Sequence, residues 1–239
     1  MHPKPEILFE DEHMLVVNKP TGITVIPDRI HTDRETLQSI LQKDYGRLFV
    51  VHRIDRGTSG VICFARTEEA HKNLSLQFQN HEVRKFYLAV VQGILKDKSG
   101  TIEVPIGENK SRPGIMTVDK RGKAALTLYK LEEQFKHAAL LEVEIKTGRT
   151  HQVRVHMAFI GHPLLVDDVY GKSGAFYFST IKKHYKPSGE EELPTIARLT
   201  LHAFKLSLTH PATKKEMLFE APVPKDIQTL LKLLRKYDV

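Results

Sequence analysis

The stretch that most constrains the fold is residues 48–65, where charged side chains interrupt two apolar runs. The apolar runs are Leu48-Phe49-Val50-Val51 and Val61-Ile62-Cys63-Phe64-Ala65. Short apolar runs bounded by turn residues predict buried strands. Between them lie Arg53, Asp55 and Arg56, and then the turn sequence Gly57-Thr58-Ser59-Gly60. We therefore expect a carboxylate between two guanidinium groups, on a tight turn that joins two core strands.

Asp55 has two interpretations at this stage. The neighbouring positive charges favour the carboxylate over the acid, and an ionised carboxylate in a positive setting suits a nucleophile or base that acts on a polyanion. Alternatively, Asp55 only caps the turn and pairs with an arginine, because structural ion pairs also perturb carboxylates. The local sequence leaves both open.

Length and composition indicate a soluble protein of ordinary kind. With 239 residues, of which 41% are apolar, the chain suits one large domain or two small lobes that share a sheet. It has no apolar stretch long enough to span a membrane and no signal peptide at its start. The single cysteine, Cys63, lies in an apolar run and is expected to be a reduced core residue. These features predict a cytoplasmic protein.

The excess of positive charge permits nucleic-acid binding. Lys and Arg outnumber Asp and Glu by 36 to 29, a net charge of +7. Three basic clusters lie among Gly, Pro and Ser residues that indicate loops: Lys110-Ser111-Arg112, Lys120-Arg121-Gly122-Lys123 and Lys182-Lys183-His184-Tyr185-Lys186. Any one cluster could simply be a solvated face, but together with a charged site they predict phosphate contacts.

Periodicity predicts mostly short strands, with helices between them. The expected strands are 14–17, 23–26, 48–51, 61–65, 84–93, 101–105, 115–118, 124–131, 138–146, 199–208 and 216–220. The expected helices are 33–45 (ended by Gly46), one capped by Thr67, 150–161, and one from about Lys225. Residues 171–194 are polar and irregular, which indicates a surface insertion.

A second charged constellation occupies residues 147–163. Thr150 is the expected N-cap and Gly161 the expected stop of a helix that buries Val153, Met157 and Ile160. Arg154 then lies in the first turn, where it can reach a neighbouring cleft. The spacing of His151 and His156 matches no metal-binding pattern, so we expect no metal here. Tyr87 lies beside small Ala89 in strand 84–93 and could equally be an ordinary core tyrosine.

Taken together, these sequences resemble those of the RluA-type pseudouridine synthases. His52 to Gly60 resembles the catalytic sequence of that family, Lys85 to Gly93 its second motif, and Thr147 to His156 its third. Val16 to Gly22 and Leu201-His202-Ala203 also fit, so the resemblance runs from about residue 6 to residue 222 in the family's order. It implies an α+β fold, with a mixed, largely antiparallel sheet, flanking helices and a cleft across the sheet.

The resemblance also implies roles for individual residues. Asp55 corresponds to the catalytic aspartate, Tyr87 to the ring that stacks on the target uracil, and Arg154 to the arginine that pairs with the aspartate. Arg53 corresponds to a residue that helps to extrude the base, and Arg149 is a second candidate for the ion pair. His52 and Lys19 are assigned to substrate binding. The implied chemistry needs neither a metal nor another cofactor.

The same resemblance implies one catalytic domain, 1–239, that isomerises specific uridines in RNA to pseudouridine on a flipped-out base. The expected partner is a structured ribosomal or transfer RNA stem-loop. We expect a monomer, no membrane contact, no obligate protein partner and no separate N-terminal RNA-binding module, since residues 1–50 already supply strands. The chain departs from the family pattern at Val166-Asp167-Asp168-Val169-Tyr170-Gly171 and in the insertion 171–194.

Two other classes of function compete with this interpretation. A non-catalytic RNA-binding protein could use the same basic residues, and it would not need the carboxylate of Asp55. A nucleosidase or glycosidase would need a second acid, for which Glu103, Asp119 and Asp167 offer no convincing sequence context. Pseudouridine formation needs only one prominent carboxylate, because it must exclude water and keep the base in the site.

Overall fold

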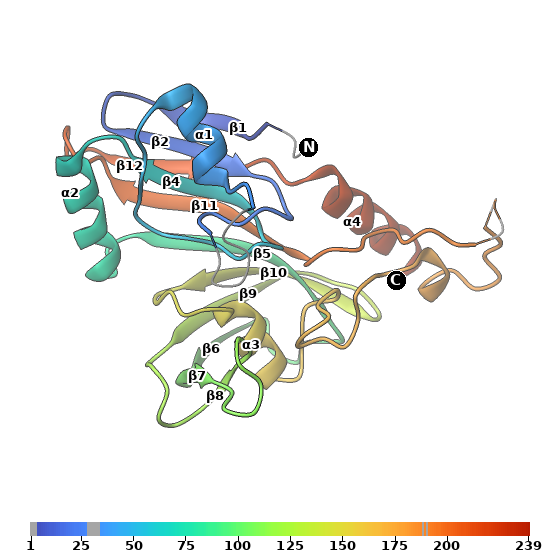
Figure 1. The fold of residues 1–239 in the computed structure, drawn as a ribbon. Helices are drawn as coiled ribbons and strands as arrows, with labels where there is room; N and C mark the ends of the chain where they lie inside the picture. The colour runs from blue at the N-terminus through green and yellow to red at the C-terminus, as the bar shows by residue number, and fades with distance from the viewer. Residues whose placement is uncertain (1–3, 28–33, 188, 190) are drawn as a thin grey trace. The chain divides into compact units, whose positions relative to one another are not determined.

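The computed structural model describes residues 4–27, 34–187, 189 and 191–239. The chain forms two compact units (Figure 1). The first unit comprises Met1–Phe86 and His202–Pro222, and the second comprises Tyr87–Leu201 and Val223–Val239. The chain passes from the first unit to the second within strand β5 (Arg84–Gln92). Among the described residues, no helix has the length and apolar character needed to cross a membrane.

The first unit is built on the strands β1-β2-β4-β11, in that order. These are β1 (Glu6–Glu10), β2 (Met14–Lys19), β4 (Ser59–Ala65) and β11 (Leu201–Thr209), with β3 (Phe49–Val50) beside β4 and β12 (Glu216–Glu220) beside β11. The pairing of β11 with β4 is parallel and the other pairings are antiparallel. All seven residues of β4 are buried, because apolar clusters cover both faces of the strand.

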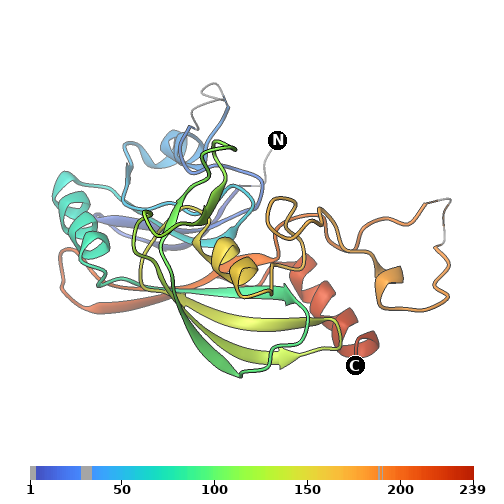
Figure 2. The ribbon, with the colours of Figure 1, turned by 90° about the horizontal axis from the view of Figure 1, so that it is seen from below.

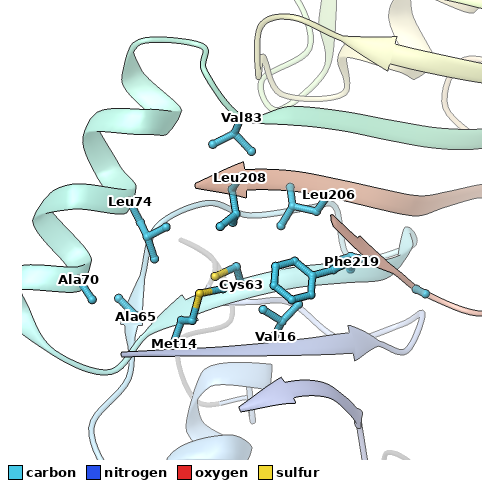
Figure 3. Packing of buried hydrophobic residues seen from close by; sticks show 12 residues of the cluster. Met14, Val16, Cys63, Ala65, Ala70, Leu74, Val83, Leu206, Leu208 and Phe219 are labelled. Atoms are coloured by element: carbon cyan, nitrogen blue, oxygen red, sulfur yellow. The ribbon is translucent and has the colours of Figure 1, made fainter. Parts of the chain in front are cut away.

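Helices α1 (Leu37–Tyr45) and α2 (Glu68–Gln79) belong to different core clusters of this unit. Leu74 of α2 packs with Met14, Cys63, Leu208 and other side chains from β2, β4 and β11 (Figure 3). Leu37 and Leu41 of α1 pack with the side chains of β2 and β4 that alternate with these. Thr67 caps α2 by accepting the N–H of Ala70, and Gly46 ends α1, both as predicted.

The second unit contains the strand order β5-β10-β9-β6 and a separate two-stranded hairpin, β7-β8. The strands are β6 (Ser99–Glu103), β7 (Ile106–Glu108), β8 (Met116–Val118), β9 (Leu126–Gln134) and β10 (Ala138–Ile145). Helix α3 (Gln152–Phe159) lies beside the hairpin in both views (Figures 1 and 2). Helix α4 (Lys225–Tyr237) buries Ile227, Leu230, Leu231 and Leu234 in a core with Val90 and Leu140. A short 3-10 helix, η1 (Phe178–Thr180), lies in the predicted insertion.

The α+β fold with a mixed, largely antiparallel sheet is confirmed. Strand 84–93, strand 138–146 with its partly exposed Glu142 and Glu144, and the helix from Lys225 are close to the predicted bounds. Cys63 is buried and is not part of a disulfide, as expected. The sequence analysis missed β1, and it placed Gly107 in a loop, whereas Gly107 lies within β7.

The predicted strand 23–26 is wrong, because this segment is an irregular loop. Its main-chain carbonyls instead accept the N–H groups of Leu37 and Gln38 from Thr24 and Val25, at 2.8 and 3.1 Å. The first N–H groups of a helix have no partner within the helix, so this loop satisfies two of them. Helix α1 accordingly starts at Leu37 with Thr36 as its N-cap, later than predicted, and residue 33 lies outside the described residues.

Candidate active site

Asp55 lies at the start of a tight turn that precedes β4. The N–H of Thr58 donates to the carbonyl of Asp55 at 3.1 Å, which closes a four-residue turn. The predicted turn was Gly57 to Gly60, but Ser59 and Gly60 already belong to β4. The apolar run before the turn contributes only the two partly buried residues of β3, so residues 51–54 lead to the turn as irregular chain. Asp55 itself is partly exposed.

A buried lysine holds this turn from below. Lys19 is 0% exposed, and its Nζ donates to the carbonyls of Pro20, Ile23 and Arg56 at 3.0, 2.8 and 3.2 Å. Three carbonyl acceptors match the three N–H donors of an ammonium group. The sequence analysis expected Lys19 at the exposed edge of a turn, and that placement is wrong. The observed bonds indicate that Lys19 positions the main chain after Asp55.

The neighbouring loop completes this support through main-chain bonds. The N–H of Gly22 donates to the carbonyl of Arg56 at 2.8 Å, and the hydroxyl of Thr21 donates to the carbonyl of Gly57 at 2.8 Å. In return, Nε of Arg56 donates to the carbonyl of Gly22 at 2.9 Å. The turn and this loop are therefore joined by bonds that depend on where the main chain runs.

Gly60 is required where β4 passes between β2 and β11. Its φ is +118°, and a Cβ atom built there would lie 2.1 Å from the carbonyl oxygen of Ala203. Gly60 pairs with Lys19 of β2 and with Ala203 of β11. Next to it, Oγ of Ser59 lies 2.9 Å from Nδ1 of buried His202. The absence of a side chain at residue 60 thus allows three strands to meet just after the turn.

His52 is tied to the scaffold on the approach to Asp55. Its Nε2 accepts the N–H of Cys63 at 3.0 Å, and its ring stacks on Phe78 of α2 with the centroids 4.5 Å apart. Burial, together with the positive charge of Lys85, lowers the pKa of His52 to about 3. An uncharged ring that accepts a main-chain N–H supports the segment, and substrate binding by His52 stays a prediction. Arg53, one residue on, is exposed.

Arg154 is held by a carboxylate that the sequence analysis did not select. Its Nε and Nη2 donate to the two carboxylate oxygens of Asp167 at 2.7 and 2.9 Å, in the two-point geometry that arginine favours. Arg154 is 5% exposed and Asp167 is 0% exposed. Burial by itself raises the pKa of the Asp167 carboxyl, but Arg154 and the N–H groups of Tyr170 and Val169 outweigh burial and hold that pKa below its usual range.

Helix α3, which carries Arg154, begins differently from the prediction. His151, with φ of +56°, precedes the first helical residue, and Thr150 is not the N-cap. The side chain of Gln152 supplies the missing bonds. Its Oε1 accepts from the hydroxyl of Thr147 and the N–H of Arg149 at 2.7 and 3.0 Å. Its Nε2 donates to the carbonyl of Leu126 at 3.0 Å, so a buried amide fixes the start of the helix on β9.

Neither histidine of this segment is arranged for a metal. Nε2 of His156 donates to the carbonyl of Val104 at 3.0 Å, while its Nδ1 lies 2.8 Å from the hydroxyl of Thr127. Burial lowers the pKa of His156, which favours the neutral ring. Nδ1 of His151 lies 2.9 Å from the hydroxyl of Tyr170. Among the described residues, no cluster of three or more histidine, cysteine or acidic side chains could hold a metal ion.

The remaining predicted residues are distributed between the two units. Tyr87 lies in β5, 9% exposed, and belongs to the second unit together with Arg154 and Arg149. Nε of Arg149 donates to the carbonyl of Ala124 at 2.8 Å. Asp55 belongs to the first unit, which also contains its supports. The assignment of these residues to catalysis or to substrate binding remains a prediction.

Sequence comparison identifies the family. The family model of RNA pseudouridylate synthases matches residues 13–159, a range that contains the Asp55 turn, Tyr87 and Arg154. This chain belongs to that family. The RluA-type resemblance is confirmed, and the protein is an isomerase that forms pseudouridine in RNA.

Individual relatives agree with this conclusion. The chain is 40% identical over 236 residues to ribosomal large subunit pseudouridine synthase D of Pseudomonas aeruginosa, covering 97% of this chain and 72% of the relative. It is 38% identical over 241 residues to the enzyme of the same name from Zymomonas mobilis, covering 96% of this chain and 72% of the relative.

Solved structures of related proteins share the fold. Human RNA pseudouridylate synthase domain containing 1 superposes with a TM-score of 0.71 at 27% identity, covering 98% of each chain. Human RNA pseudouridylate synthase domain containing 4 gives a TM-score of 0.72 at 24% identity, covering 96% of this chain and 93% of the human one.

Proposed function

We propose that this pseudouridine synthase modifies uridines of the large-subunit ribosomal RNA, with Asp55 as the catalytic carboxylate. The observation that carries the proposal is the name shared by relatives 38–40% identical over nearly the whole chain, which are ribosomal large subunit enzymes. The whole range 1–239 acts as a single catalytic domain in this proposal. The site residues support it, because the chain surrounds Asp55 with a dedicated scaffold of buried bonds.

The chemistry assigns one role to each proposed catalytic residue. Asp55 either attacks the anomeric carbon of the ribose or removes the proton next to it, and the glycosidic bond between carbon and nitrogen breaks. The uracil then rotates and rejoins the sugar through its carbon 5, with loss of the proton from that carbon. Tyr87 stacks on the base, and Arg154 supplies positive charge for the catalytic carboxylate.

The target uridine must leave its stack to reach these residues. Extruding a base costs about a few kcal/mol, and stacking on an aromatic ring returns about 1–3 kcal/mol per base. In our proposal Arg53, exposed on the chain before the turn, helps to extrude or replace the base. Tyr87 is the ring that offsets the cost, which makes an aromatic residue at this position a requirement.

RNA docking is assigned to the basic loops of the second unit. Lys110 and Arg112 lie exposed in the loop between β7 and β8, and Lys182 approaches the rings of Phe178 and Tyr237 at 5.4 and 5.2 Å. We expect these cations to contact phosphates, which position an RNA without reading its sequence. Replacing Lys110 and Arg112 by Ala should weaken RNA binding and flatten its dependence on salt by about 0.7 log units per lost contact.

The substrate assignment is tested by mapping pseudouridines after incubation with purified protein. The substrates are large-subunit ribosomal RNA and transfer RNA, each from cells that lack the gene, and Asp55→Asn serves as the inactive control. New pseudouridines in the ribosomal RNA, made by the wild-type protein alone, support the proposal. Modification of transfer RNA only would contradict the ribosomal assignment, and equal modification by Asp55→Asn would contradict the catalytic one.

A further inference from the structure

Two residues that follow α3 contact the guanidinium of Arg154 in different ways. Asp167 binds its Nε and Nη2 edge with both carboxylate oxygens, at 2.7 and 2.9 Å. The aromatic ring of Tyr170 lies 4.9 Å from the central carbon of the guanidinium, within the range of a cation–π contact. An edge contact and a ring contact together fix both the plane and the rotation of the group.

Asp167 is itself held in place before it binds the arginine. Its Oδ1 accepts the N–H groups of Val169 and Tyr170 at 3.0 Å each, and its carbonyl accepts the N–H of Gly171 at 2.9 Å. Gln92 of β5 donates to the carbonyls of Leu164 and Gly171 at 3.2 Å each. The carboxylate therefore has one orientation, set by a short turn that is anchored to a central strand.

The hydroxyl of Tyr170 extends this arrangement to the β7-β8 hairpin. It accepts the N–H of Met116, the first residue of β8, at 2.9 Å. Since its oxygen is the acceptor in that bond, its proton can be donated to Nδ1 of His151 at 2.9 Å. His151 has a positive φ and directly precedes α3. One tyrosine thus joins the hairpin, the start of the arginine helix and the guanidinium.

We propose that Asp167 and Tyr170 are positioning residues for the isomerisation, with Asp167 orienting Arg154 and Tyr170 coupling that orientation to the β7-β8 hairpin. The loop of this hairpin carries Lys110 and Arg112, so RNA bound there stabilises the same arrangement that holds the arginine. The inference rests on the proposed role of Arg154 in catalysis. It assigns work to the segment Val166 to Gly171, where the sequence departs from the family pattern.

The two residues should have separable kinetic effects. Asp167→Asn keeps the shape of the side chain but loses one acceptor oxygen, so Arg154 loses its fixed orientation. Because a small misplacement of a catalytic group can cost about 100-fold in rate, we expect a loss of that order in kcat with little change in KM. Tyr170→Phe keeps the ring and removes only the hydroxyl. It should raise KM for RNA several-fold and leave kcat nearly unchanged.

A second readout separates positioning from simple loss of structure. The Nε–H signal of Arg154, assigned by its loss in Arg154→Lys, reports the bond to Asp167 in nitrogen-15 NMR spectra of the full chain. We expect this signal to be protected from exchange in the wild-type protein and in Tyr170→Phe, and to exchange rapidly in Asp167→Asn. Asp168→Asn and Tyr177→Phe, which alter neighbouring exposed residues, serve as matched controls and should behave like the wild-type protein.

Three results decide the matter. Unchanged kcat and an unchanged Nε–H signal in Asp167→Asn would overturn the role of Asp167, and an unchanged KM in Tyr170→Phe would overturn the coupling. If Asp167→Asn does not fold, Asp167→Glu, which keeps the charge, must show the same fall in kcat at a smaller size. If the wild-type protein modifies no RNA while the NMR signal still follows Asp167, the proposed function fails and the orientation of Arg154 by Asp167 stands.

Discussion

The turn that carries Asp55 and the helix that carries Arg154 each present one charged side chain, but they are supported by different kinds of bond. Around Asp55, the acceptors are the main-chain carbonyls of Arg56 and Gly57, bound by Lys19, Gly22 and Thr21. Around Arg154, the partners bind the side chain itself. They are the carboxylate of Asp167 and the ring of Tyr170.

This difference predicts different consequences of mutation. Main-chain bonds fix the path of the whole turn, so losing one displaces Arg53, Asp55 and Arg56 together. Side-chain bonds fix one group, so losing one reorients Arg154 and leaves the neighbouring chain in place. Variants of the first kind should lower RNA affinity and turnover together, and variants of the second kind should lower mainly turnover. The following predictions test this distinction, from the largest expected effect to the smallest.

Removing the carboxylate of Asp167 should have the largest effect on stability. Asp167→Ala leaves a buried guanidinium without its charge partner, which costs about 3–5 kcal/mol in the free energy of unfolding. Urea denaturation measures this loss, and Asp168→Ala, which changes the adjacent exposed aspartate, is the control. A loss below about 1 kcal/mol, the range of exposed ion pairs, would show that Arg154 does not depend on this partner.

Adding one methyl group at Gly60 should be the next most costly change. Gly60→Ala places a Cβ atom 2.1 Å from the carbonyl oxygen of Ala203, in a main chain that cannot move without disturbing two strand pairings. We expect a loss of about 2–4 kcal/mol from overpacking and backbone strain combined. Gly46→Ala has a positive φ but no atom within 4 Å, so it should show the strain alone. Equal losses in both variants would refute the steric argument.

Replacing Lys19 tests the main-chain support directly. Lys19→Met keeps the length of the side chain and removes all three donors, so buried carbonyls lose a partner at a cost of about 1–3 kcal/mol. Because the turn moves as a unit, RNA affinity and kcat should fall together. Lys43→Met, at an exposed lysine that pairs with Glu35 across 2.6 Å, is the control. A fall in kcat with RNA affinity intact would place Lys19 with the side-chain supports instead.

The smallest effect concerns acid. The pKa of His52 in the folded protein is lowered to about 3, so the folded state excludes a proton that the unfolded state accepts. The stabilising contribution is complete above the pKa of about 6.5 in the unfolded chain and is lost as pH falls towards 3. Between pH 6 and 4, wild-type stability should fall by about 1.4 kcal/mol per pH unit more than that of His52→Gln, measured by urea denaturation. Parallel pH profiles would mean that His52 is not kept neutral.

Local sequence patterns predicted the elements that depend only on their own residues. The alternation in β5, the Thr67 cap and the apolar face of α4 are each visible within about ten residues of sequence. The path of residues 23–26 was not predictable, because apolar residues favour a strand while the loop is used to cap α1.

The chemistry of the site was predicted less completely than its position. The sequence showed Asp55, Tyr87 and Arg154, but it could not show that Lys19 turns inward to bind the carbonyl of Arg56, 37 residues away. Asp167 lies 13 residues beyond Arg154 in an unusual stretch, and only folding reveals that the two form a pair. Long-range partners of this kind leave no periodic signal.

The central claim is that the supported turn of the first unit exists to place one catalytic carboxylate. We would measure single-turnover tritium release from RNA labelled at uracil carbon 5, together with RNA affinity, for the wild-type protein, Asp55→Asn and the exposed control Asp97→Asn. The account predicts release by the wild-type protein and Asp97→Asn, none by Asp55→Asn, and similar RNA affinity in all three. Release by Asp55→Asn at the wild-type rate would contradict it.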